Sequence, residues 1–248
     1  MPSSVLTTAD GLELAGRRWL ATSTPVASVV IVHGFNASSE CPNVEALAEA
    51  LHADGFDVVS YDARGHGRSP GESTLGDHEQ HDVAAAVELA RERTRHVVLV
   101  GASMGAIATL RYAITDDDLA GVISVSCPAR WRLPRNVRGI VAAAMTRTPL
   151  GRRLTTRLSG VRVASRWTAP VPPIDLVGLL HAPVVFVHGT LDRFISVRDA
   201  AQLCERAPEP RQLLIIRDMG HAFDPVAIEP LRQAVSWTVA HRVDTSTA

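Results

Sequence analysis

The amino-acid sequence predicts an α/β domain with one mostly parallel β-sheet and helices on both of its faces. Short apolar runs rich in β-branched residues recur along the chain, and helical patterns of about ten residues or more separate them. Such helical crossovers join strands that run parallel. The 248 residues, 46% of them hydrophobic, are enough to build one large core.

The predicted elements begin with a hairpin, because Asp10-Gly11 separates two strand patterns at 5–9 and 12–20. Continuous apolar runs are typical of strands that are buried on both faces of a parallel sheet. Six such strands are expected near residues 27–32, 57–61, 96–100, 121–126, 183–188 and 212–216. Helices are expected near residues 43–54, 77–93, 104–115, 196–207 and 226–241.

This alternation breaks at residues 129–173, a stretch too long for a plain loop and without a strand pattern. Leu150, Leu154 and Leu158 recur there at helical spacing, which predicts an amphipathic helix. We therefore expect an α/β core formed by residues 1–128 and 174–248, with residues 129–173 as a short helical cap insert over the site.

The arginine-rich insert, residues 129–173, contains no acidic residue, and none lies between Asp118 and Asp175. Its arginines are Arg130, Arg132, Arg135, Arg138, Arg147, Arg152, Arg153, Arg157, Arg162 and Arg166. Three interpretations remain open: a solvated face paired with carboxylates elsewhere, a rim that attracts an anionic substrate, or a face that docks transiently on an anionic membrane.

A candidate nucleophile follows the strand at 96–100. Gly101-Ala102-Ser103-Met104-Gly105 reads Gly-x-Ser-x-Gly between a strand and a helix, an arrangement that forces the serine into a sharp, exposed turn. Gly101 and Gly105 are supporting residues, because larger side chains would collide with neighbouring backbone at so tight a turn. Ser103 is the predicted nucleophile.

A serine nucleophile needs a histidine base and a carboxylate that orients the base. Asp192 follows the strand at 183–188, and His221 follows the strand at 212–216, in the chain order expected after such a serine. Asp192 could instead cap the helix that begins near Ser196, and Asp218 is a rival acid on the loop of His221. We expect Asp192 and His221 to complete a catalytic triad.

The loop after the strand at 27–32 supplies candidate donors for an oxyanion. In this arrangement one donor is the N–H that follows the nucleophile, here Met104, and the other comes from an earlier strand–helix loop, here Phe35. His33 and Gly34 are supporting residues, and Gly34 allows the backbone to approach closely. The glycine-containing turn at 62–69 is expected to buttress both loops.

Five motifs, at 33–35, 62–69, 101–105, 189–192 and 220–221, resemble the α/β-hydrolase superfamily. The resemblance is narrower to its serine esterase, lipase and peptidase-like branch, which includes monoacylglycerol lipases and many bacterial hydrolases. It runs from about Leu12 to Val239 and is weakest between Pro128 and Pro173. It implies an enzyme that cleaves a carboxylic ester or thioester through an acyl-enzyme, without metal or cofactor.

Other functions on the same residues remain open. The triad would also serve an amide or peptide hydrolase, or an acyltransferase or lyase, and a ligand-binding receptor could retain the fold. The substrate is expected to be a small ester or thioester, anionic or lipid-like.

The composition limits which binding partners and which cellular compartment are expected. A net charge of −1 and the lack of a basic stripe argue against nucleic acid. No apolar stretch approaches about 18 residues and no signal peptide is evident, so no stable membrane insertion is expected. Three scattered cysteines are typical of a reducing, cytoplasmic compartment. The oligomeric state stays open.

One cluster of potential metal ligands stands at the start of the helix at 77–93. His78, Glu79, His81 and Asp82 lie close together in the sequence, but no matching open-site ligand set accompanies them. Carboxylates at a helix start interact favourably with the helix dipole, so we expect a capping role and no metal.

Overall fold

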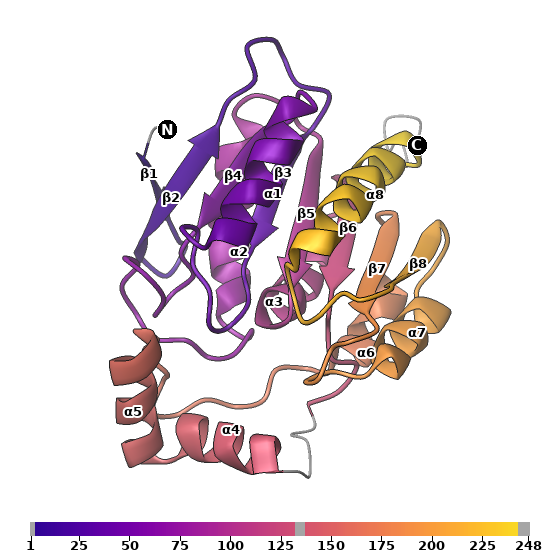
Figure 1. The fold of residues 1–248 in the computed structure, drawn as a ribbon. Helices are drawn as coiled ribbons and strands as arrows, with labels where there is room; N and C mark the ends of the chain where they lie inside the picture. The colour runs from indigo at the N-terminus through magenta and orange to yellow at the C-terminus, as the bar shows by residue number, and fades with distance from the viewer. Residues whose placement is uncertain (1–2, 132–136, 243–248) are drawn as a thin grey trace.

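The computed structural model describes residues 3–131 and 137–242, which form one eight-stranded sheet with helices on both faces (Figure 1). The strand order is β1-β2-β4-β3-β5-β6-β7-β8. The strands are β1 (Ser3–Thr7), β2 (Glu13–Trp19), β3 (Ser28–Val32), β4 (Asp57–Tyr61), β5 (Val97–Ala102), β6 (Leu119–Val125), β7 (Val184–Gly189) and β8 (Arg211–Ile216). The fold class predicted from the sequence is confirmed.

Only the N-terminal hairpin departs from parallel pairing. β1 and β2 pair antiparallel around the predicted turn, where Gly11 takes a φ of 86°, and β2 pairs antiparallel with β4. The remaining neighbours, from β4 through β3 to β8, all pair in parallel. Their carboxyl ends therefore meet at one edge of the sheet, where ligands bind in such folds.

Alternate residues of the buried strands feed two cores. Val30 and Val32 of β3 pack on the face covered by α2 (Glu79–Arg91), α3 (Met104–Ala113) and α7 (Val197–Arg206). Val29 and Ile31 pack on the opposite face, covered by α1 (Pro42–Ala53) and α8 (Ile228–Ala240). Burial on both faces explains why these strands read as continuous apolar runs.

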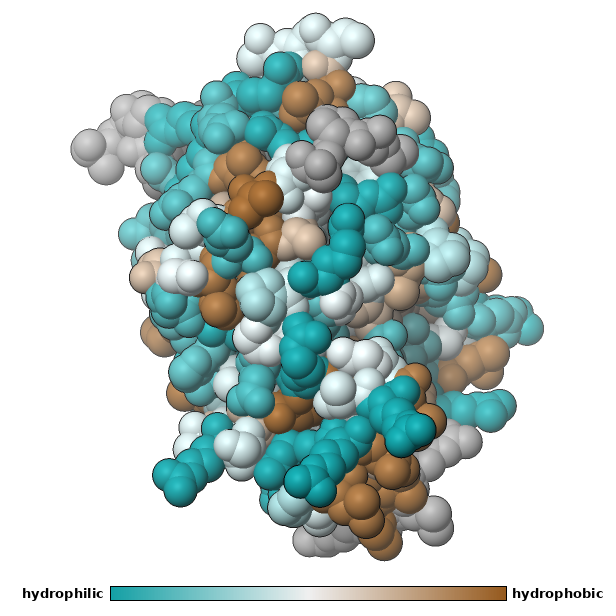
Figure 2. Space-filling view, turned by 90° about the vertical axis from the view of Figure 1, so that its left-hand side faces the viewer, coloured by the Kyte–Doolittle hydropathy of each residue, from teal (hydrophilic) through white to brown (hydrophobic). Residues whose placement is uncertain are grey.

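The arginine-rich insert contains two helices, α4 (Val137–Arg147) and α5 (Pro149–Ser159), below the sheet in Figure 1. Thr148 caps the start of α5, and left-handed Gly160 ends it. The predicted leucine stripe forms, yet Leu150, Leu154 and Leu158 are 70%, 44% and 73% exposed. Figure 2 shows hydrophobic side chains gathered at this lower end of the molecule, beside hydrophilic ones.

The chain then returns from the insert to the core. Residues 161–164 pair with the loop that follows β4: the Arg162 N–H donates to the Gly65 carbonyl, and Ser73 and Val163 form a β-bridge. A short helix α6 (Pro173–Leu176) and the 3₁₀ turns η1 (Val177–Leu179) and η2 (Pro225–Ala227) complete the described elements. None of the helices within residues 3–131 and 137–242 combines the length and apolar character that a membrane crossing requires.

Candidate active site

Ser103 occupies a strained turn between β5 and α3. Its backbone has φ 54° and ψ −113°, a left-handed conformation that a non-glycine residue rarely adopts. A Cβ at Gly101 would lie 2.4 Å from Thr109 Oγ1, and one at Gly105 would lie 2.3 Å from the Val32 carbonyl oxygen. Both glycines are therefore required by the close packing of the turn.

The three residues that the sequence singles out for a triad lie together. His221 Nε2 is 3.0 Å from Ser103 Oγ, and His221 Nδ1 is 2.7 Å from Asp192 Oδ2. They come from the loops after β5, β7 and β8, which the parallel sheet brings to one edge. Nδ1 can donate to the carboxylate, which leaves Nε2 to accept the proton of the serine hydroxyl.

Asp192 is held from two sides. Its side chain is fully buried, and Oδ1 accepts hydrogen bonds from the backbone N–H groups of Phe194 and Ile195. Burial alone would raise the pKa of Asp192, but the hydrogen bonds from His221 and from these amides outweigh it and lower the pKa. The carboxylate is therefore ionised at neutral pH.

The alternative assignments for the acid do not fit the geometry. Asp218 is 72% exposed and lies beside Arg217, 3.7 Å away. The helix after β7 is capped by Ser196, whose hydroxyl accepts from the Arg198 N–H, so Asp192 is not its cap.

The loop after β3 approaches Ser103 closely. A Cβ at Gly34 would lie 3.4 Å from Ser103 Cβ and 3.3 Å from the Ala102 carbonyl oxygen. Among the described residues, the N–H groups of Phe35 and Met104 have no hydrogen-bond partner. An N–H without a partner beside a nucleophile is available to a ligand.

Two buried histidines hold this loop. His33 Nε2 accepts from the Ala63 N–H, so Nδ1 donates to the Gly34 carbonyl. Burial lowers the pKa of His33 to about 4, which keeps the ring neutral. His66 Nε2 lies 2.7 Å from the Phe35 carbonyl oxygen. The sequence predicted that the turn at 62–69 supports this loop, but not which residue makes the contact.

The acidic residues of the 78–82 cluster are engaged in fixing loops. Glu79 accepts from the Ser73 and Thr74 hydroxyls and the Gly76 N–H, while Asp82 binds Arg64. Within the described part of the chain, no group of three or more His, Cys, Asp or Glu side chains is arranged for a metal. Glu79 and Asp82 stand in the first turn of α2, as expected for carboxylates at a helix start, and they also hold the neighbouring loops.

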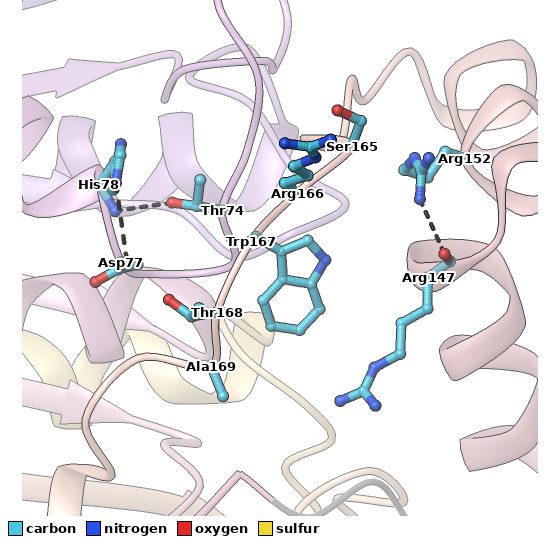
Figure 3. A pocket seen from close by; sticks show the side chains of 10 residues that line it. All are labelled: Thr74, Asp77, His78, Arg147, Arg152, Ser165, Arg166, Trp167, Thr168 and Ala169. Carbon is cyan, nitrogen blue, oxygen red and sulfur yellow. Dashed lines mark hydrogen bonds and ion pairs between the residues drawn. The ribbon is translucent and has the colours of Figure 1, made fainter.

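A cavity of about 630 Å³ lies between the core and the arginine-rich insert (Figure 3). Thr74, Asp77 and His78 line it from the core side. From the insert it is lined by Arg147, Arg152, Ser165, Arg166, Trp167, Thr168 and Ala169. We call this cavity the arginine pocket.

The insert arginines whose side chains the structure describes do not form the carboxylate pairs that one interpretation expected. No ion pair within the described residues involves Arg130, Arg147, Arg152, Arg153, Arg157, Arg162 or Arg166. Arg162 instead donates to the backbone carbonyls of Ser69 and Gly71. Arg132 and Arg135 lie outside the described residues, and the side chain of Arg138 is not described.

Known proteins resemble this chain in sequence. The uncharacterized protein YqkD of Bacillus subtilis is 27% identical over 240 residues, covering 88% of this chain and 72% of the relative. The alpha/beta hydrolase domain-containing protein 17B of Xenopus laevis is 27% identical over 173 residues, covering 66% of this chain and 50% of the relative.

Solved structures share the fold. The esterase Pf2001 of Pyrococcus furiosus superposes with a TM-score of 0.75 at 20% identity, covering 97% of this chain and 92% of that one. A thermophilic esterase from Thermogutta terrifontis gives a TM-score of 0.73 at 24% identity, covering 97% and 99%. Both are α/β hydrolases in shape, and at these identities the likeness establishes the fold alone.

The family comparison identifies the family of the chain in addition to its fold. Residues 23–171, more than half of the chain, match the family described as serine aminopeptidase, S33. That span contains the Ser103 turn and the Phe35 loop. The chain therefore belongs to the S33 serine aminopeptidase family of α/β hydrolases.

Proposed function

We propose that this protein is a serine hydrolase that cleaves a carboxylic ester or thioester through an acyl-enzyme. The proposal rests on one observation: the contacts of 3.0 Å and 2.7 Å that link Ser103 to His221 and His221 to Asp192. A base in contact with a nucleophile, and itself oriented by a buried carboxylate, is the arrangement that activates a serine.

Acylation begins when Ser103 Oγ attacks the carbonyl carbon of the ester and His221 Nε2 takes the hydroxyl proton. Asp192 stabilises the resulting imidazolium. The carbonyl oxygen becomes an alkoxide, which the N–H groups of Phe35 and Met104 stabilise. The intermediate collapses, the bond to the leaving group breaks, and His221 returns the proton to the departing alcohol or thiol.

Deacylation repeats these steps with water. His221 removes a proton from a water molecule that attacks the acyl carbon, and the same two N–H groups stabilise the second alkoxide. Collapse releases the carboxylic acid and restores the Ser103 hydroxyl. The triad, the two donors and the supporting His33, Gly34, Gly101 and Gly105 need no metal or cofactor for this cycle.

We further propose that residues 129–173 act as a helical cap on a core of residues 1–128 and 174–248. Pairing of residues 162–164 with Gly65 and Ser73 supports this division, because it attaches the insert at the edge where the strands end. A cap at that edge would select which substrates reach Ser103.

Amide hydrolysis is the second candidate, because the matched family is described as a serine aminopeptidase. An aminopeptidase substrate presents a cationic amino terminus, which the guanidinium groups of the arginine pocket would repel. Hydrolysis of p-nitrophenyl hexanoate and of leucine p-nitroanilide, which carries the free amino group, separates the two when they are compared side by side. We expect turnover of the ester only.

The test of the main proposal is Ser103→Ala. We expect kcat/KM on p-nitrophenyl hexanoate to fall by about 10⁴-fold or more and labelling by a fluorophosphonate to disappear. Ser236→Ala, at an exposed position on α8, is the matched control and keeps both properties. Fluorophosphonate labelling that persists in Ser103→Ala would contradict the assignment of the nucleophile.

A further inference from the structure

Three arginines line the arginine pocket, and none of them has a carboxylate partner in the part of the chain that the structure describes. Arg147 ends α4, Arg152 stands in the first turn of α5, and Arg166 lies on the segment that returns to the core. None of the three has an acidic side chain within 4.0 Å among the residues described. Arg152 donates instead to the Arg147 carbonyl at 2.9 Å, which fixes the two residues side by side (Figure 3).

The only acidic side chain in the pocket lining is already engaged. Asp77 Oδ1 accepts from Arg111 at 2.7 Å, and its Oδ2 lies 3.9 Å from His78 Nε2. Its charge is therefore largely matched by Arg111, and the remaining lining is positive. Like charges gathered around one cavity favour a bound anion that balances them.

The rest of the lining suits an organic anion. Trp167 provides an apolar surface, with the Arg147 guanidinium carbon 5.6 Å from its ring centroid, and the Ser165 and Thr168 hydroxyls add polar groups. A volume of about 630 Å³ lies in the range of small-molecule sites and far exceeds that of a single inorganic ion. Guanidinium groups bind carboxylates and phosphates through paired hydrogen bonds.

The pocket adjoins the turn that carries Ser103. Thr74 lines the pocket, and Ser73 and Gly76 of the same segment lie close to Met104, which follows Ser103 in the chain. Ser73 Oγ is 3.5 Å from Met104 Sδ, and a Cβ at Gly76 would lie 3.2 Å from the Met104 carbonyl oxygen. The segment 73–76 therefore contacts the residue that follows Ser103 and also contributes Thr74 to the pocket lining.

We propose that the arginine pocket binds a carboxylate or phosphate group of the substrate whose ester bond Ser103 attacks. This inference rests on the proposed function and narrows its substrate class to anionic esters. The guanidinium groups would hold the anionic end while the acyl carbon lies at Ser103, which lowers KM for such substrates and makes the binding sensitive to salt.

The kinetic test compares two esters with the same six-carbon acyl chain, the mono-p-nitrophenyl ester of adipate and p-nitrophenyl hexanoate. We expect the wild type to prefer the adipate ester, and Arg147→Gln with Arg166→Gln to lower the ratio of their kcat/KM values by about 10- to 100-fold, mainly through KM. Arg153→Gln, on α5 outside the pocket lining, keeps the wild-type ratio.

A binding test separates this inference from the proposed function. Adipate and phenyl phosphate are titrated calorimetrically into Ser103→Ala protein, which needs no turnover, and the two probes distinguish carboxylate from phosphate recognition. We expect at least one to bind, and to bind about 10-fold more weakly when Arg147 and Arg166 are also replaced by glutamine. Binding of neither probe, or equal binding by both proteins, would overturn the proposal that the arginine pocket binds an anion. Loss of hexanoate turnover and of fluorophosphonate labelling in the wild type would overturn the proposed function instead.

Discussion

At the scale of the residue, Asp192 shows how one carboxylate can do two tasks. Oδ1 fixes its own loop through the Phe194 and Ile195 N–H groups, while Oδ2 faces the His221 ring. The lowered pKa of Asp192 means that this acceptor stays charged at neutral pH. His188 is a further buried neighbour, with Nε2 3.4 Å from Oδ2.

Replacing the Asp192 carboxylate should disturb the orientation of the His221 ring without unfolding the protein. Asp192→Asn keeps the shape and the loop hydrogen bonds, but an amide no longer holds His221 in the required tautomer. We expect kcat to fall by about 10⁴-fold on p-nitrophenyl hexanoate, with the thermal midpoint nearly unchanged. Asp218→Asn, at the exposed rival acid, should retain activity within about twofold. Similar losses in both variants would argue against Asp192 as the orienting acid.

At the scale of the element, α5 shows that a sequence pattern can predict a helix without predicting whether its apolar face is buried. Helical spacing of Leu150, Leu154 and Leu158 correctly predicted an amphipathic helix, because that spacing is a local property. Whether the stripe is covered depends on residues far away in the chain, and here it stays exposed. The short α6 and η1 escaped prediction for a related reason: one turn of helix is too brief to show a period.

The exposed stripe leads to a stability prediction. Leu158→Ala, at a side chain 73% exposed, should change the free energy of unfolding by less than about 0.5 kcal/mol. Leu203→Ala on α7, at a fully buried side chain, should cost about 2–5 kcal/mol. Urea unfolding of both variants measures the contrast. A large loss from Leu158→Ala would mean that α5 packs against the protein in solution.

At the scale of the whole molecule, the parallel sheet brings the candidate catalytic residues together. The loops after β3, β5, β7 and β8 all leave the same edge, and the last three bring Ser103 and Asp192 within hydrogen-bond distance of His221. His33, His66, Glu79 and Arg64 tie the loops to each other beneath that edge. This support requires several polar groups to be buried, and each must be in the correct protonation state because burying an unpaired charge is unfavourable.

Global stability should therefore depend on pH through His33. The folded protein protonates this ring only near pH 4, whereas the unfolded chain does so near pH 6.5. Between these values the unfolded chain binds the extra proton, so the free energy of unfolding falls as the pH drops, by at most about 3 kcal/mol. Above pH 6.5 this contribution is fully present.

Two measurements check the role of His33. Urea unfolding from pH 7.5 to pH 4.5 should show a shallower loss of stability in His33→Gln than in the wild type. A titration of the His33 ring by NMR in the folded protein should find it predominantly neutral throughout that range, with a midpoint near pH 4. Equal slopes for the two proteins, or a ring that titrates near pH 6.5, would contradict the prediction.

The sequence by itself determined the alternation of strands and helices, the hairpin at Asp10-Gly11 and the order of the motifs around Ser103, Asp192 and His221. These follow from local patterns, since periodicity and turn residues act over a few positions. Only the tertiary structure decided that Asp192 rather than Asp218 faces His221, that His66 holds the Phe35 loop, and that unpaired arginines surround a cavity. Those outcomes depend on distances between segments far apart in the chain, which the packing of the whole sheet sets.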